Sequence, residues 1–259
     1  MPGWIRKLDM DEALGIETKQ DQVVVRSLWG DAWRTLRRNR AAMTGAMLMA
    51  IIVLVVTVGP WFSQYAYDFT DWPNTSIGPS LGTGHFFGTD TLGRDLFVRT
   101  LYGGRISLLV GVVASVVSLL IGISYGATAG YFGGRLDAIM MRFVDILYAM
   151  PFMFFVILLM VFFGRNILLI FVAIGAINWL DMARIVRGQT LSLKQREFVE
   201  AAQAQGVGAL AILVRHIVPN LLGVVAVYIT LTIPQVILVE SFLSFLGLGV
   251  QEPMTSWGA

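Results

Sequence analysis

Residues 106–134 read ISLLVGVVASVVSLLIGISYGATAGYFGG, a run that contains no charged side chain. A helix needs about 20 predominantly apolar residues to cross the hydrocarbon core of a bilayer. The run is continuous and lacks the apolar and polar alternation of a barrel strand, so it predicts a membrane-spanning helix. The whole chain agrees, because 56% of its residues are hydrophobic and only 14% are charged, against roughly 25% charged in soluble domains.

Four further apolar segments predict additional spans. The segment from Asn166 to Leu180 is too short to cross a bilayer by itself, so its span must continue through Asp181 and Arg184. The predicted spans are 41–62, 106–134, 139–164, 166–184 and 217–239. We therefore expect an all-α fold, a polytopic membrane helix bundle with five spans.

The basic residues predict which side of the membrane each loop faces. With the N-terminus inside, the cytoplasmic segments hold 15 of the 19 Lys and Arg residues, and such residues are enriched in cytoplasmic loops. We therefore expect a cytoplasmic N-terminal segment at 1–40 and a transmembrane domain at 41–259. Within that domain, the loop at about 63–104 lies outside and the loop at about 188–216 lies inside.

The loop at 188–216 is a polar island between two apolar spans. It reads REFVEAA at 196–202, then Gly206, then HIVP at 216–219. The glutamate of its EAA triplet offers a carboxylate to basic groups of a partner, and the two alanines let another surface approach closely. An ordinary amphipathic loop would contain similar helices, but the complete spacing is more specific.

The same island predicts two short helices. We expect the first at Leu191–Gln205, with Ser192 as a possible N-cap. Gly206 suits the left-handed residue that ends a helix. The second helix, at about 209–216, leads to Pro219, whose missing N–H is tolerated in the first turn of the last span.

The island resembles the EAA loop of ABC-importer permeases, a helix-turn-helix that docks into a groove on the ATPase subunit. Its ending, RHIVPN at 215–220, is similar to that of the peptide and nickel importer branch. FGTDTLGRD at 87–95 and ESFLSFLGLG at 240–249 are similar to signatures of that branch, the first of its C-type subunits. The segments 151–164 and 166–192 resemble the C-type subunit of oligopeptide importers.

This resemblance implies a type I ABC-importer permease of a bacterial inner membrane, which translocates oligopeptides delivered by an extracytoplasmic peptide-binding protein. The other implied partners are a homologous B-type permease subunit, two ATP-binding subunits and the lipid bilayer, with no nucleic acid. The family pattern has six spans, so we expect the final segment to be missing from this sequence or truncated. The implied ATPase-coupling residues are Glu200, Ala201, Ala202, Gly206, Arg215 and Pro219.

The chemistry that the chain lacks supports a transport subunit rather than an enzyme. A P-loop requires G-x-x-x-x-G-K-[ST], and no lysine of the chain stands in that context. There is no cysteine, and His85 and His216 stand far apart in the sequence without ligand-like neighbours. We therefore expect no cofactor and no metal site, and ATP hydrolysis by a partner subunit.

Charged residues near the inner ends of the third and fourth predicted spans suggest a second site. Asp145 and Arg184 stand almost equally far from the hairpin at Arg165, on opposite sides of it, so the two lie at similar depth. Charged residues three apart can also pair within one helix. We predict an inner-gate charge network of Arg142, Asp145, Asp181 and Arg184, with a purely structural role as the alternative.

Several alternatives stay open. The spacing of Gly122, Gly126 and Gly130 predicts close helix contact, either within this subunit or along the path beside the partner permease. Glu240 faces the path or the binding protein, or snorkels to the membrane interface. A dipeptide or nickel-chelate importer of the same branch is an alternative function. A secondary transporter or channel is the alternative from another class, and such proteins usually place ionisable residues near mid-membrane.

Overall fold

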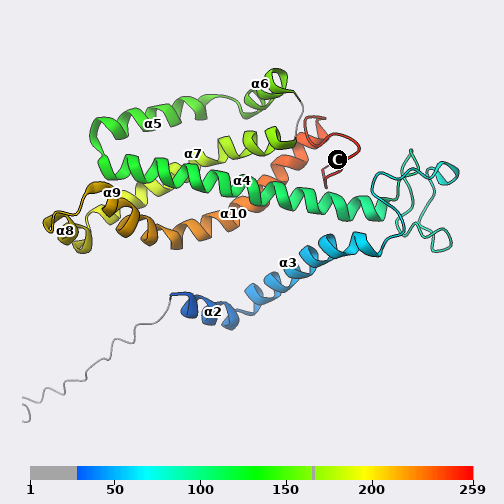
Figure 1. Ribbon diagram of the computed structural model, residues 1–259, viewed down its shortest axis with the longest axis horizontal. Coiled ribbons are helices and arrows are strands. Elements are labelled where there is room, and N and C mark those ends of the chain that lie inside the picture. The colour runs from blue at the N-terminus through cyan, green and yellow to red at the C-terminus, as the bar shows by residue number, and fades with distance from the viewer. Residues whose placement is uncertain (1–27, 165–166, 259) are drawn as a thin grey trace, which may run out of the picture. The chain divides into compact units, whose positions relative to one another are not determined.

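The computed structural model describes residues 28–164 and 167–258. In this part of the chain all regular structure is helical, apart from one antiparallel bridge between Thr89 and Asp95 (Figure 1). The expected all-α class is therefore confirmed. The chain divides into two compact units, residues 1–50 and 51–259.

The first unit contains α2 (Leu28–Arg38) and the beginning of α3 (Arg40–Val58). Asn39 separates the two helices, and its side-chain oxygen accepts a hydrogen bond from the backbone N–H of Ala42 at 3.2 Å, as an N-cap residue does. Residues 1–27 of the predicted N-terminal segment lie outside the described residues. The first predicted span, 41–62, agrees with a candidate membrane span at Arg40–Phe62, which ends in the short 3₁₀ helix η1 (Gly59–Phe62).

Three described helices are long and apolar enough to cross a membrane, Arg40–Phe62, α4 (Leu96–Phe132) and the continuous helix Ala209–Phe245. A bent pair, α5 (Gly134–Ala149) and α6 (Phe152–Phe163), is a fourth candidate if it counts as one span. The remaining predicted span, 166–184, falls on α7 (Ile167–Lys194), which follows an undescribed junction at 165–166.

The predicted span at 139–164 falls on the bent pair α5 and α6. The chain bends by 89° between α5 and α6. Met150 at the bend has an extended backbone, with φ −76° and ψ 130°. Its neighbour Pro151 accounts for this, because the proline ring disfavours the helical conformation in the residue before it.

Two helices extend beyond the predicted spans, because charged residues continue them. Helix α4 begins at Leu96 rather than 106, so the loop before it ends at 95 instead of 104. Asp95 caps α4 by accepting a hydrogen bond from the N–H of Val98 at 2.8 Å. Arg105 lies inside the helix, where its guanidinium donates to the backbone carbonyls of Val56 and Thr57. Helix α10 (Val218–Phe245) likewise continues past 239.

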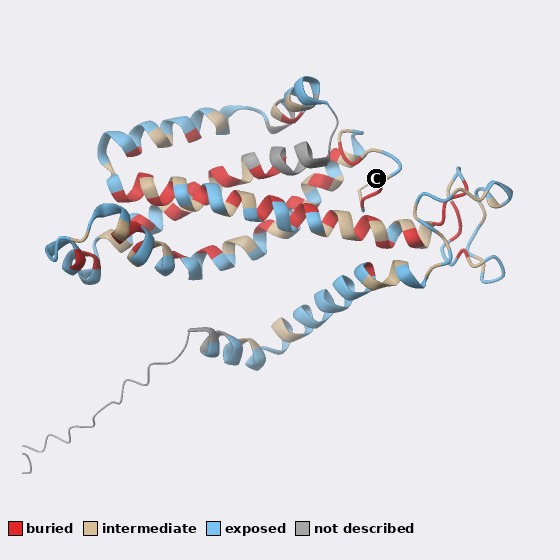
Figure 2. Ribbon diagram, in the orientation of Figure 1, coloured by how far each residue is buried: buried red, intermediate tan, exposed pale blue. Residues whose placement is uncertain are grey.

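Helix α4 is the central element of the second unit and packs against α7 on one side and α10 on another. A methyl group at Gly126 would overlap the carbonyl oxygen of Ala183, and one at Gly130 would lie 2.8 Å from the carbonyl oxygen of Arg187. Figure 2 shows the buried stripe that follows α4. The glycine spacing therefore serves packing within this subunit, and the alternative of a path wall at these glycines is wrong.

Candidate functional site

The polar island forms two short helices, α8 (Glu197–Ala204) and α9 (Ala209–Ile212), at the end of the unit away from the loop at 63–95 (Figure 1). The prediction of a single helix Leu191–Gln205 capped by Ser192 is wrong. Helix α7 runs on to Lys194, and α8 begins only after Arg196, whose backbone is extended. Ser192 does not cap a helix because its hydroxyl lies inside α7, facing the carbonyl of Gly188 at 3.4 Å.

The turn after α8 depends on glycine, as predicted. Gly206 has φ +77°, the left-handed region that favours glycine. Its N–H donates to the carbonyl of Gln203 at 2.9 Å, and the N–H of Val207 donates to the carbonyl of Ala202 at 3.1 Å. These two bonds make a Schellman motif, which ends α8 sharply and fixes the direction of α9.

Helix α8 has one face buried and one face exposed. Val199 is fully buried and Ala202 is 6% exposed, and both join a cluster with Tyr131 of α4 and Ile212 of α9. Glu200 and Ala201 are exposed on the other face. The two alanines of the EAA triplet thus differ: Ala202 holds the helix on its own subunit, while Ala201 and Glu200 lie on a surface that another protein can reach.

Helix α9 continues directly into α10 through the π-helical turn η3 (Leu213–Ile217). The prediction that a separate helix ends near His216 is therefore wrong. Pro219 lies in the first turn of α10. A proline inside a helix removes one hydrogen bond and its ring crowds the carbonyl four residues earlier, here that of Arg215. A wider π turn at this place accommodates the proline without a break.

Of the predicted charge network, the structure brings together one pair. Arg184 Nη2 lies 2.8 Å from Asp145 Oδ1, and both side chains are partly exposed. The guanidinium of Arg184 also lies over the ring of Tyr148, 4.4 Å from its centroid. Among the described residues neither Arg142 nor Asp181 has an ion-pair partner. The role of the pair as an inner gate stays a prediction.

A stronger pair lies nearer the island, and sequence reasoning missed it. Arg187 of α7 donates two parallel hydrogen bonds to Asp137 of α5, at 2.5 and 2.6 Å. Asp137 and Arg187 lie at unequal sequence distances from Arg165, so the rule that pairs residues equally far from this hairpin does not find the pair. Lys194 closes the same region by donating to the carbonyl of Tyr131 at 2.6 Å.

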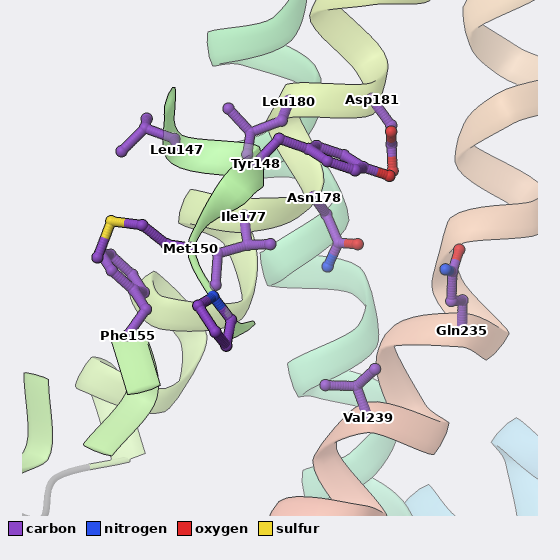
Figure 3. A pocket seen from close by; sticks show the side chains of 11 residues that line it. Leu147, Tyr148, Met150, Phe155, Ile177, Asn178, Leu180, Asp181, Gln235 and Val239 are labelled. Carbon is purple, nitrogen blue, oxygen red and sulfur yellow. The ribbon is translucent and has the colours of Figure 1, made fainter. Parts of the chain in front are cut away.

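A cavity of about 440 Å³ lies between the α5–α6 bend, α7 and α10 (Figure 3). Its volume is within the usual range of small-molecule sites. Most of its lining is apolar, including Met150, Pro151 and Phe155. Its polar side chains are Tyr148, Asn178, Asp181 and Gln235. Sequence reasoning named only Asp181, because the other three carry no charge and come from three separate elements.

The opposite end of the unit contains a second charge cluster. Arg94 donates to Asp90 at 2.7 Å and to Glu252 at 2.9 Å, so it joins the loop at 63–95 to the segment after α10. The hydrogen bond from Arg94 lowers the pKa of Glu252 from its usual value. Among the described residues no group of three or more His, Asp or Glu side chains is placed to hold a metal ion.

Glu240 is fully buried, so the predictions that it faces the path or the binding protein, or snorkels to the interface, are wrong. Its carboxylate accepts hydrogen bonds from Ser107 of α4 at 3.1 Å and from Ser244 at 2.7 Å. The hydroxyl of Ser107 also accepts from the N–H of Trp257 at 3.1 Å. These contacts hold the segment after α10 against the core.

Two family descriptions match the chain. Residues 122–259 match the binding-protein-dependent transport system inner membrane component, and this match contains α7, α8, α9 and α10. Residues 27–79 match the N-terminal TM domain of oligopeptide transport permease C.

Individual relatives are similar over most of the chain. The oligopeptide transport system permease protein OppC of Escherichia coli K12 is 60% identical over 92% of this chain and 79% of that protein. Its counterpart in Haemophilus influenzae is 56% identical over 98% of this chain and 82% of that protein. The dipeptide transport system permease protein DppC of Bacillus subtilis is 46% identical over 88% of this chain and 71% of that protein.

Proposed function

The chain belongs to the family of binding-protein-dependent transport system inner membrane components, and we propose that it is the C-type permease subunit of an ATP-driven oligopeptide importer. The substrate proposal is supported by the 56% and 60% identity to oligopeptide permeases of two bacteria. Membership of this family implies ATPase and binding-protein partners, and we further propose a homologous B-type permease beside this chain.

The observation that carries this proposal is the two-faced helix α8. A surface that must transmit force from an ATPase needs firm attachment to its own subunit and a free outer face. Val199 and Ala202 provide the attachment, while Glu200 and Ala201 are exposed. Arg215 is exposed as well, on the turn that leads from α9 into α10. We propose this exposed surface as the ATPase-docking surface.

We also propose a type I topology with five spans among residues 41–259 and a cytoplasmic N-terminus. Helix α7 would be the fifth span, although it is not among the three or four helices that are selected as candidate spans by length and composition. Its 28 residues reach about 42 Å at 1.5 Å per residue, enough for a hydrocarbon core of about 30 Å. The Arg94–Glu252 contact supports a shared outer side for the loop at 63–95 and the segment after α10.

ATP-driven uptake tests the proposed function. The complete importer is reconstituted in vesicles, and uptake of a radiolabelled tripeptide is measured with and without ATP, the ATPase subunits and the binding protein. We expect uptake only when all are present. Uptake that continues without the ATPase subunits would identify a secondary transporter or channel and overturn the proposal.

A single substitution tests the docking surface. Ala201→Arg places a large cation on the exposed face of α8, so we expect the ATPase subunits to be lost on copurification while the permease remains folded. Thr75→Arg, an equally exposed change in the loop at 63–95, is the matched control and should retain them. Normal ATPase recovery with Ala201→Arg contradicts the proposed surface.

A further inference from the structure

The cavity between the α5–α6 bend, α7 and α10 contains a carboxylate that the proposed topology places within a membrane span. Asp181 lines the cavity (Figure 3), and among the described residues no Lys, Arg or His forms an ion pair with it. Arg184, one turn further along α7, is engaged by Asp145 instead. An ionisable side chain at membrane depth is costly without a partner, which makes it a marker of function.

The other polar groups of the cavity match the groups of a peptide backbone. Asn178 donates through its side-chain nitrogen to the carbonyl of Ile174 at 3.0 Å, which leaves its carbonyl oxygen as an acceptor. Gln235 lies across the cavity on α10 and is exposed (Figure 3). An amide side chain offers both a donor and an acceptor, as a peptide bond does. The apolar lining of Met150, Pro151 and Phe155 accommodates side chains with little selectivity.

The cavity lies well away from α8, and the Asp145–Arg184 pair lies between them. At 1.5 Å per residue, Asn178 lies about 25 Å of helix before the end of α7. Gln235 lies about 25 Å of helix after the start of α10. Arg184 precedes the end of α7 by only about 15 Å. Arg184 contacts the ring of Tyr148, which lines the cavity.

Resting on the proposed oligopeptide transport, we propose that this cavity is a transient binding site for the amino-terminal end of the transported peptide. Asp181 binds the α-ammonium group, and Asn178 and Gln235 bind the first peptide groups. The α-ammonium group is the one cation that every unmodified peptide carries, whatever its sequence. The site would therefore recognise peptides as a class, while the apolar lining tolerates different side chains.

The test compares trialanine with N-acetyl-trialanine, which lacks the ammonium charge. Initial uptake rates are measured in the reconstituted importer at saturating binding protein. The readout is the ratio of the rate for trialanine to the rate for N-acetyl-trialanine. Because every permease variant uses the same binding protein, its own preference cancels when ratios are compared. We expect this ratio to be about tenfold lower in Asp181→Asn than in the wild type, because asparagine can still accept a hydrogen bond but lacks the negative charge that strengthens it.

Two further variants separate this role from a structural one. Asp181→Glu retains the charge and should retain most of the ratio, while Asp68→Asn makes the same chemical change in the exposed loop and should leave the ratio unchanged. The proposal is overturned if Asp181→Asn leaves the ratio unaltered, even where both rates fall. A wild-type importer that takes up neither peptide would instead overturn the proposed function.

A second measurement does not depend on Asp181 variants folding. A photoreactive residue replaces Gln235, and a matched one replaces Phe245, which is exposed at the end of α10. On illumination during uptake, we expect radiolabelled trialanine to be attached at position 235 and not at 245. Equal labelling at both positions, or none at 235, contradicts a peptide site in the cavity.

Discussion

Replacing Gly126 by alanine tests how α4 and α7 are packed. The added methyl group would overlap the carbonyl oxygen of Ala183 and lie 3.0 Å from the backbone nitrogen of Arg187. Both atoms belong to the backbone of α7, so no side-chain rotation relieves the contact and the helices must move apart. Overpacking of this kind costs about 1–3 kcal/mol, which exceeds the gain of about 1 kcal/mol that alanine gives inside a helix. The difference is a net loss of up to about 2 kcal/mol.

Gly188→Ala is the matched control for this change. Gly188 is also inside a helix, α7, but it is exposed and an added methyl group there has no neighbour within 4 Å. We therefore expect Gly188→Ala to raise the free energy of unfolding by up to about 1 kcal/mol. Both variants are purified in mild detergent and unfolded by denaturant titration. If Gly126→Ala proves as stable as Gly188→Ala, the close contact of α4 with α7 at this glycine is refuted.

Three other outcomes follow from the charged pairs. Asp137→Asn should lower the free energy of unfolding by about 1–2 kcal/mol, because its bidentate pair with Arg187 is half-buried. Asp145→Asn should lower it by less than about 1 kcal/mol, because its pair with Arg184 is largely exposed. Equal losses in the same denaturant titration would contradict this ranking. If the Asp145–Arg184 pair acts directly, either single charge reversal should reduce uptake and the double swap should restore it; a swap that restores nothing argues against direct pairing. The Arg94–Glu252 contact lowers the pKa of Glu252. The contact therefore stabilises the folded state fully above the unfolded pKa of about 4.3, and this stabilisation is lost as the pH falls through the lower folded pKa. Hydrogen exchange of residues 250–258 should rise over that pH range, and Glu252→Gln should abolish the rise.

Local backbone requirements were the most predictable part of the polar island. Gly206 could be placed in a left-handed turn because the residue that ends a helix often has the left-handed conformation, which favours glycine. Ser192 shows the limit of the same reasoning. Serine is a good N-cap, but it is also tolerated inside a helix when its hydroxyl faces a carbonyl one turn earlier. A sequence pattern alone does not distinguish these two positions.

Contacts between distant residues were the least predictable part. Judged by charge alone, Arg105 and Glu240 predict the ends of two spans. Both residues nevertheless lie inside helices, where groups from other elements form hydrogen bonds with their side chains. The partner of Arg105 is the carbonyl of Val56, 49 positions away, and a partner of Glu240 is Ser107, 133 positions away. The cavity escaped prediction for the same reason, since its polar side chains come from α5, α7 and α10 and form no pattern along the chain.

The two helices α7 and α10, which contribute polar side chains to the cavity, also flank the polar island. Helix α7 carries Asn178 and Asp181 and ends shortly before α8 begins, and Gln235 lies on a helix that runs without a break from α9. A displacement of the polar island would therefore act on helices that also form two walls of the cavity. On the α7 side the Asp145–Arg184 pair and the Tyr148 ring lie between the cavity and the loop, and these contacts are partly exposed and weak enough to exchange. The strong bidentate pair of Asp137 and Arg187 lies closer to the loop, so we expect α5 and α7 to stay joined there while the weaker pair opens.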